Sequence, residues 1–393
     1  SDLLHLPAAP EKLDPEQIAQ VITEGAIFGS YNYKDHISTT SDTPKTSAAS
    51  SLTLLEPDPR RAAKMKKGAA AGQIIADAQN RARMIANRPG CEINPPLLAK
   101  EAQKIARQAD LQCTIFDEKK LAKMKMNAIL AVGSGSASKP RLTVLKYNGR
   151  KGLKMIDVVV IGKAITFDSG GLSLKPSEHM ESMKFDKSGG CNTIAILTAA
   201  ARLKLPLNIV GLIPSAENLP SHTSYRPGDI ITTYSGKTIE VQNTDAEGRI
   251  ILSDALAYAA EMKPKAIIDM ATLTGACMVA LGHHNAGLFG NNDALKLQLQ
   301  AAAQFSGEPV WPMPSGPDYL EQMKSKVADL KNVGGRPGGS CTAAAFLGEF
   351  VGDVPWAHID IAATADADQE KPYRTHGATA YGVRLVLEYL RGL

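Results

Sequence analysis

The stretch DVVVIGKAITFDSGGLSLKPS, residues 157–177, decides the fold class. It begins with four consecutive apolar residues, Val158 to Ile161, a pattern typical of a strand that is buried on both faces. Charged and small residues follow at once: Lys163, then Asp168 with three small neighbours, then Lys175. In a sheet that helices cover on both sides, polar groups of this kind collect at the strand ends, where ligands bind. The stretch therefore predicts such a sheet with a site at its edge.

The same alternation continues along the chain. The predicted strands are residues 114–116, 128–132, 141–145, 156–161, 208–213, 266–270 and 357–361. The predicted helices are residues 188–203, 250–261, 293–304, 342–351 and 378–390. Apolar strands that alternate with helices predict an α/β fold with a mixed, mostly parallel central sheet flanked by helices.

The N-terminal part has a different pattern. Helical spacing begins near Asp14, a suitable N-cap followed by proline, and a strand-like segment follows at residues 51–57. A long alanine-rich helix is predicted for roughly residues 59–87. We therefore divide the chain into three parts, namely a small N-terminal domain remnant, a connecting helix and the main domain: residues 1–56, 57–90 and 91–393.

Composition restricts the class of protein. The 393 residues include 44% hydrophobic and 21% charged residues, which is typical of a globular chain. A net charge of +4, with basic residues spread along the chain, gives no indication of nucleic-acid binding. The five cysteines form no CxxC pair, as expected for free thiols in a reducing compartment. No apolar run reaches the roughly 18 residues of a membrane span, and the start does not resemble a signal peptide. These features predict a soluble, cytoplasmic protein.

Acidic residues at two further junctions allow two interpretations. Residues 241–260, VQNTDAEGRIILSDALAYAA, place Asp245, Glu247 and Arg249 at alternate positions before a helix, and Asp186 precedes another helix. These residues could cap helices and form surface ion pairs. They could instead hold two divalent ions about 3.5–4 Å apart, because an extended segment would direct Asp245 and Glu247 to one point. A lysine can join such a site, since a nearby dication favours its neutral amine.

Several motifs together resemble one family. NTDAEGR, residues 243–249, resembles the signature of the leucyl aminopeptidases, metallopeptidase family M17. GKAITFDSGGLSLKPS, MKFDKSGG, DMATLTGA, CTAAAFLGEFV and WAHIDIA match other motifs of that family in the same order. The similarity covers at least residues 87–393, and EGAIFGSYNY looks like the end of the family's N-terminal domain.

The resemblance implies a site with two metal ions, usually zinc, with manganese, cobalt or magnesium acceptable in the more exchangeable position. The residues that match ligands of the first ion are Lys163, Asp168, Asp186 and Glu247. Those that match ligands of the second are Asp168, Asp245, with its main-chain carbonyl, and Glu247. Lys175 and Arg249 match the catalytic pair, and the family's counterpart of Arg249 binds a bicarbonate that shuttles protons.

The resemblance also implies an activity, the release of N-terminal amino acids from peptides with a free N-terminus. Hydroxide from a water between the ions would attack the first peptide carbonyl, and Lys175 would stabilise the oxyanion. The residues that match the substrate pocket are Met183, Asn243, Ala246, Thr272, Leu273 and Gly275. Such a pocket suits leucine and other apolar residues with broad specificity. Family members are typically homohexamers.

Other enzyme classes fit less well. A two-metal phosphoesterase normally has several histidines at ligand spacing, and neither His179 nor His283 and His284 has such spacing to the acids. A Ser–His–Asp site built from Ser169, His179 and Asp168 is not needed, and GSGSAS, residues 133–138, lacks the third glycine of a nucleotide loop. One departure from the family is Lys187, where methionine is common. We expect it to place a positive charge beside the site.

Overall fold

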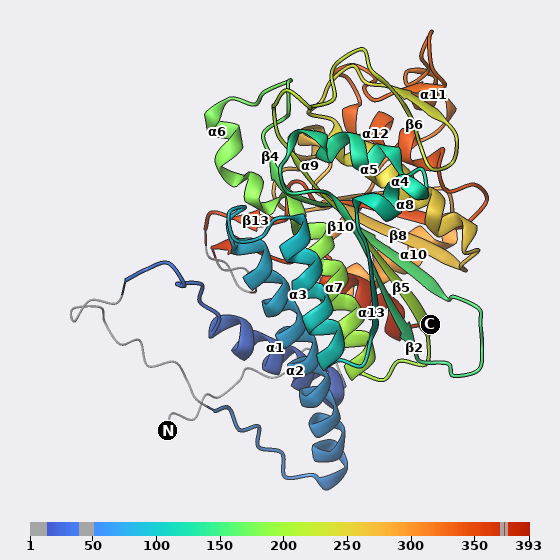
Figure 1. The fold of residues 1–393 in the computed structure, drawn as a ribbon. Helices are drawn as coiled ribbons and strands as arrows, with labels where there is room; N and C mark the ends of the chain where they lie inside the picture. The colour runs from blue at the N-terminus through green and yellow to red at the C-terminus, as the bar shows by residue number, and fades with distance from the viewer. Residues whose placement is uncertain (1–13, 39–50, 370–372, 374–375) are drawn as a thin grey trace.

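The computed structural model describes residues 14–38, 51–369, 373 and 376–393. Its central sheet has the strand order β1-β2-β5-β3-β8-β12-β9-β10, with β4 paired to β5 (Figure 1). The strands are β1 (Gln112–Phe116), β2 (Arg141–Asn148), β3 (Val158–Gly162), β4 (Ala164–Asp168), β5 (Asn208–Asn218), β8 (Ala266–Ala271), β9 (Ala286–Gly290), β10 (Val310–Pro312) and β12 (Trp356–Asp360). Five of the eight pairings are parallel, and only β1–β2, β2–β5 and β12–β9 are antiparallel. The predicted mixed, mostly parallel α/β sheet is confirmed.

Helices cover both faces of this sheet, because its strands are apolar on both sides. Val158 and Val160 of β3 pack into one buried cluster, whereas Val159 and Ile161 pack into the other. The first cluster includes α2 (Pro59–Asn87), α3 (Pro95–Gln108), α7 (Ser188–Arg202), α10 (Asp293–Ser306) and α13 (Val383–Arg391). The second includes α4 (Glu118–Lys123), α5 (Asn127–Val132), α8 (Glu247–Glu261) and α12 (Gly339–Gly348).

Shorter elements complete the described part of the chain. The helical ones are α1 (Pro15–Gly29), η1 (Gly133–Gly135), α6 (Ser177–Met180), η2 (Glu181–Lys187), α9 (Gly275–Leu281) and α11 (Pro317–Glu321). The strands β6 (Ile230–Thr232), β7 (Thr238–Glu240) and β11 (Leu330–Lys331) form a small sheet, and β13 (Asp366–Ala367) pairs with β14 (Gly377–Ala378). None of the described helices is both long enough and apolar enough to span a bilayer.

The break between β3 and β4 positions the first site residue. Strand β3 pairs with both β5 and β8, whereas β4 continues along β5 alone. Lys163 lies at this break, and its N–H donates to the Met270 carbonyl near the end of β8 at 3.0 Å. A Cβ on Gly189 would lie 2.2 Å from the same carbonyl oxygen, so only glycine lets α7 begin this close to the break. The local packing thus places Lys163 at the carboxyl edge of the parallel strands.

The first described helix packs directly on the main body of the chain. Asp14 caps α1 in a reciprocal capping box with Gln17, as its position before a proline predicts. A Cβ on Gly68 of α2 would lie 1.9 Å from the Glu16 carbonyl oxygen, so the two helices touch backbone to backbone. Helix α2 matches the predicted connecting helix in extent. The division at residues 56 and 90 stays a prediction.

Two predicted strands are wrong. Residues 128–132 lie in α5, whose Ile129 N–H donates to the buried Asp254 carboxylate at 3.0 Å. A short helix that is buried on most sides has the same apolar run as a buried strand, so periodicity does not separate them. Residues 51–57 form no strand. Helix α13 begins at Val383, later than predicted, because Ala378 belongs to β14.

Candidate metal centre

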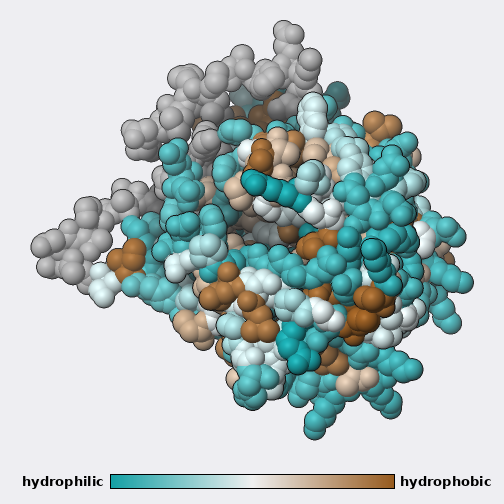
Figure 2. All heavy atoms as spheres, turned by 90° about the horizontal axis from the view of Figure 1, so that it is seen from above, coloured by the Kyte–Doolittle hydropathy of each residue, from teal (hydrophilic) through white to brown (hydrophobic). Residues whose placement is uncertain are grey.

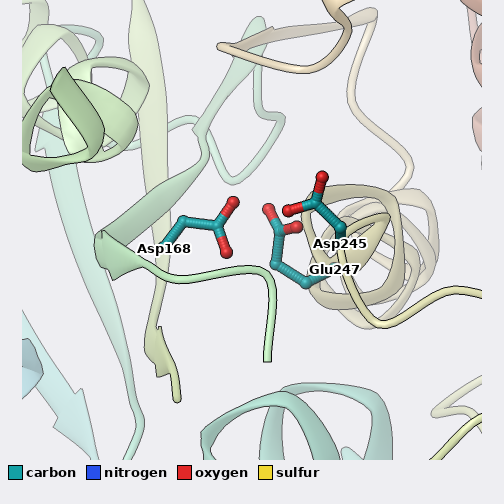
Figure 3. A group of neighbouring side chains, drawn as sticks. All are labelled: Asp168, Asp245 and Glu247. Atoms are coloured by element: carbon teal, nitrogen blue, oxygen red, sulfur yellow. The ribbon is translucent and has the colours of Figure 1, made fainter. Parts of the chain in front are cut away.

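Three carboxylates converge at the edge of the sheet where β4 ends. Asp168 is the last residue of β4, Asp245 lies in the turn before α8, and Glu247 is the first residue of that helix. Each offers a carboxylate oxygen that lies within 4.8 Å of the others, and Figure 3 shows the three groups facing one another. The predicted extended segment at 245–249 is wrong, because α8 begins at Glu247. The carboxylates of Asp245 and Glu247 lie close together because Asp245 is in a turn and Glu247 begins the helix that follows it.

Lys163 joins a fourth carboxylate to this group. Its Nζ lies 2.8 Å from Asp186 Oδ1 and 2.8 Å from Glu247 Oε1, and it donates to the Thr272 carbonyl at 2.8 Å. Thr272 Oγ1 donates to Asp186 Oδ1 at 2.6 Å. Helix α7 has no side-chain cap, so Asp186 in η2 is held by these contacts and does not cap the helix.

Lys175 lies among the remaining acids. Its Nζ is 2.9 Å from Asp168 Oδ2 and 2.5 Å from Asp245 Oδ1. The loop that carries it is tightly turned: Gly170 has a φ of +85°, and a Cβ there would lie 2.9 Å from Asp245 Oδ1. Glycine is therefore required at this position by both conformation and space.

The charges of this cluster are unbalanced, because four buried or half-buried carboxylates face only two ammonium groups. Burial and neighbouring carboxylates raise the pKa of Glu247, of Asp186 and of Asp245. Burial lowers the pKa of Lys163, but the charges of Asp186 and Glu247 outweigh it and the pKa is raised. Among the described residues, Asp186 Oδ2 is buried without a hydrogen-bond partner. An oxygen-rich, negatively charged set with available amines fits divalent cations such as zinc or manganese.

Arg249 lies behind the carboxylates in the first turn of α8. Its Nη1 donates to the Asn332 carbonyl at 2.9 Å, whereas its buried Nε has no hydrogen-bond partner in the described parts of the chain. Burial lowers the pKa of Arg249 to about 10, so the guanidinium stays charged at neutral pH. A buried cation with a free donor can hold a small anion.

The comparison with known families decides the identity. The model of the cytosol aminopeptidase family, catalytic domain, matches residues 80–387. The chain belongs to the cytosol aminopeptidase family.

Relatives and solved structures of the family cover most of the chain. The probable cytosol aminopeptidase of Cenarchaeum symbiosum (strain A) is 45% identical over 98% of this chain and 78% of its own length. That of Aquifex aeolicus (strain VF5) is also 45% identical, over 95% of this chain and 74% of its own length. The structure of the bottromycin maturation enzyme BotP in complex with Mn superposes with a TM-score of 0.87 at 35% identity and covers 100% of this chain and 81% of BotP. The chain is therefore a metal-dependent aminopeptidase, a hydrolase.

The residues that match the family's substrate pocket lie on segments around the metal centre. Met183 lies in η2, three residues before Asp186, and Asn243 and Ala246 flank Asp245. Thr272 and Leu273 follow β8, and Gly275 begins α9. Gly275 is exposed and the other five are half-buried. That these residues line a substrate pocket stays a prediction.

Three polar residues that we did not predict hold the site segments in place. Asn218, the last residue of β5, donates to Asp168 Oδ1 at 2.8 Å. Asp360, the last residue of β12, accepts from Leu273 N at 3.2 Å and from Thr274 Oγ1 at 2.7 Å. Both follow apolar strands, so their position at strand ends was a usable signal. Asn332 accepts from Gln242 N at 2.8 Å and donates to Asn243 O at 2.6 Å, but it lies in a loop that has no comparable signal.

Lys187 makes no direct contact with the site carboxylates, although its charge still acts on the neighbouring Asp186. Its fully buried Nζ donates to the carbonyls of Ala86, Arg88 and Lys184 at 2.9, 2.8 and 2.5 Å. Carbonyls at the end of a helix lack intrahelical partners, so a cation is favourable there. The residue ties η2 to the end of α2.

A Ser–His–Asp arrangement is absent from the described residues around Asp168. Ser169 Oγ donates to the Asn218 carbonyl at 2.7 Å, and His179 is exposed on α6. His283 contacts the Ala363 carbonyl at 3.0 Å. Within the parts of the chain that the structure describes, the group able to hold a metal contains carboxylates and no histidine.

Gly248 packs against Lys163, so its replacement is expected to affect catalysis through the position of that lysine. A Cβ at this position would lie 2.7 Å from Lys163 Cε and 2.8 Å from Lys163 Nζ, and Lys163 is fixed by Asp186, Glu247 and Thr272. We expect Gly248→Ala to displace Lys163 and to lower kcat/KM by about a hundredfold, the cost of a misplaced active-site group. Steady-state kinetics and a thermal melt measure the two effects.

The control for Gly248→Ala is Gly29→Ala at the end of α1, where a Cβ would meet nothing within 4 Å. Alanine is favoured over glycine inside helices by up to about 1 kcal/mol. If Gly248 were only an ordinary helix residue, the Gly248→Ala protein would therefore be more stable and fully active. That result would contradict the packing argument.

Proposed function

We propose that this chain removes N-terminal residues from peptides, with a preference for leucine and other apolar residues and broad specificity, by means of a dinuclear metal site. The observation that carries the proposal is the convergence of four carboxylates and two lysines at the sheet edge of a chain of this family. Zinc, manganese or both are the proposed ions, and cobalt or magnesium could replace them.

The ligands divide into two overlapping sets. We assign one ion to Lys163, Asp168, Asp186 and Glu247, and the other to Asp168, Glu247 and the side chain and carbonyl of Asp245. Support comes from the shared contacts: Lys163 Nζ lies between Asp186 and Glu247, and the oxygens of Asp168, Asp245 and Glu247 lie within 4.8 Å of one another. Bound divalent ions supply a nucleophile by lowering the pKa of water, and they polarise the scissile carbonyl. Lys163 must lose a proton to serve as a ligand, so binding releases protons.

Lys175 and Arg249 contribute fixed positive charge. Burial opposes the charge on Lys175, but nearby carboxylates outweigh it and raise its pKa, so this ammonium is available to stabilise an oxyanion. Arg249 is anchored through Nη1 to Asn332 and has Nε free of partners among the described residues. That free donor supports the assignment of a bicarbonate beside Arg249, which would accept and return a proton during the reaction.

The free amine of the substrate would bind near Asp186, whose Oδ2 is buried without a partner in the described chain. A blocked N-terminus would leave that oxygen unpaired and add bulk. Met183 and the small residues Ala246 and Gly275 leave room for an apolar side chain. One methylene changes binding by only about 1–3 kcal/mol, so the preference for leucine would be moderate.

This function is tested with a matched pair of substrates. We expect hydrolysis of leucine p-nitroanilide in the presence of Zn²⁺ or Mn²⁺, its loss after chelation and its recovery when metal is restored. N-acetyl-leucine p-nitroanilide should be cleaved at least about a hundredfold more slowly, since the polar site for the amine stays unpaired. Equal cleavage of both substrates would exclude an aminopeptidase that requires the free amine.

We also propose that the protein is a cytoplasmic homohexamer, as the family resemblance implies. Hydrophobic residues on the face shown in Figure 2 form separate groups among hydrophilic ones. Large exposed apolar side chains include Leu174, Val279 and Trp311, which are available to contacts between subunits. Light scattering on the purified chain measures the state directly.

A further inference from the structure

A cavity lies away from the metal centre, where α1, α2 and α13 meet the end of α10. It has a volume of about 240 Å³, and its lining includes Val21, Glu24, Ile75, Phe305, Arg384 and Glu388. None of these helices carries a residue of the metal centre or of the substrate pocket. The cavity is smaller than the roughly 300–1,000 Å³ of pockets for drug-sized ligands, so it suits a small metabolite.

Arg384 is the buried cation of this cavity. Only 9% of it is exposed, and its guanidinium makes no hydrogen bond within the described ranges. Its closest acidic contacts are Glu308 Oε1 at 3.5 Å from Nε and Glu24 Oε2 at 4.0 Å from Nη1. The rings of Tyr373 and Phe28 lie 4.8 and 5.5 Å from the guanidinium carbon. Buried polar groups are almost always hydrogen-bonded, so the buried Nε without such a bond leaves this guanidinium available to a ligand in the cavity.

Glu24 provides the complementary charge. It is 3% exposed, and its Oε1 accepts from Gln20 Nε2 at 2.8 Å. Oε2 has only the distant contact with Arg384, and burial raises the pKa of this carboxyl while Arg384 opposes the shift. Glu388 also lines the cavity but is already paired with Arg391 at 3.0 Å. A ligand with only a negative charge would be repelled by Glu24, and a ligand with only a positive charge would be repelled by Arg384.

We propose that this cavity binds a free α-amino acid, with its carboxylate on Arg384 and its ammonium on Glu24. The two protein groups are 4.0 Å apart, so one ligand can reach both only if its opposite charges are carried close together, as on a single α-carbon. Val21, Ile75 and Phe305 offer an apolar environment for a side chain. The site itself is inferred from the cavity and its two charged residues. A free amino acid would also be the product that the enzyme releases, and this link between ligand and product rests on the proposed function.

Isothermal titration of the full chain carrying Glu247→Gln tests the site without turnover at the metal centre. L-Leucine should bind, whereas N-acetyl-leucine, which lacks the ammonium, and leucinamide, which lacks the carboxylate, should bind at least about tenfold more weakly. Equal binding of the three compounds, or no binding of L-leucine, would overturn the proposal.

Variants of the cavity locate the binding. Adding Glu24→Gln or Arg384→Gln should weaken L-leucine at least about tenfold, and Val21→Phe should block it by filling the space. Glu16→Gln, on the same helix but paired with Lys67 at the surface, should leave it unchanged. If Arg384→Gln fails to fold, Val21→Phe and the three compounds still decide.

Undiminished binding in the cavity variants would refute the site. Binding that needs Glu24 and Arg384, together with a wild-type chain that shows no aminopeptidase activity when metal is present, would refute the proposed function alone.

Discussion

Replacing Glu247 by glutamine is expected to lower kcat/KM for leucine p-nitroanilide by about a thousandfold or more, at least the loss caused by removing one preorganised charge-stabilising group. Glu247 is 2% exposed, and its Oε1 lies 2.8 Å from Lys163 Nζ. One of its carboxylate oxygens also lies within 4.8 Å of carboxylate oxygens of Asp168 and Asp245. Among the described residues, no other carboxylate both forms an ion pair with Lys163 and belongs to the cluster with Asp168 and Asp245. Glutamine keeps the shape but removes the charge that both proposed ions share.

The matched control is Glu261→Gln at the other end of the same helix. Its carboxylate accepts from Tyr234 Oη at 2.7 Å and is far along α8 from the site. We expect unchanged kinetics for this variant. Equal activity of the Glu247→Gln and Glu261→Gln proteins, with metal bound in both, would remove Glu247 from the mechanism.

Replacing Lys163 by methionine is expected to abolish activity and to destabilise the metal-free chain. Lys163 Nζ contacts Asp186, Glu247 and the Thr272 carbonyl, and the side chain is 3% exposed. Removing one partner of a buried ion pair costs about 3–5 kcal/mol, because the remaining charge stays desolvated. Urea unfolding in the presence of a chelator should therefore show a lower free energy of unfolding, and metal titration should show weaker binding.

Lys187→Met provides the control for Lys163→Met. Lys187 is equally buried, but its Nζ contacts three backbone carbonyls and none of the site carboxylates. We expect this variant to keep its metal affinity and kcat, with any effect confined to stability. A Lys163→Met protein that retained wild-type kcat would show that the lysine is neither a ligand nor a positioning residue.

The sequence was sufficient to predict six of the nine strands of the central sheet, most clearly β3, β5, β8 and β12, whose residues are all buried. Strands β4, β9 and β10 were not predicted. The sequence was also insufficient where the same apolar run suits two structures, as in residues 128–132, which form α5. Helix α3 was also not predicted. Its N-cap Asn94 accepts from Leu97 N at 3.0 Å across two prolines, and a proline-rich segment is as typical of the end of one helix as of the start of the next.

At the metal centre, the sequence indicated which residues to examine, and the structure shows how they meet. The alternation of Asp245 and Glu247 suggested an extended segment, but the helix begins at Glu247. The charge on Lys187 also appeared adjacent to the site in the sequence, whereas its Nζ lies at the end of α2. The direction of a side chain next to a helix start depends on packing between segments about 100 residues apart, which no local pattern contains.

Anomalous diffraction from crystals grown with Mn²⁺ tests directly whether these residues hold two divalent ions. Two manganese peaks are expected in each chain, one contacting Lys163, Asp168, Asp186 and Glu247 and the other contacting Asp168, Asp245 and Glu247. Peaks only at other positions, or an active crystalline enzyme with no peak among these side chains, would contradict this two-ion arrangement.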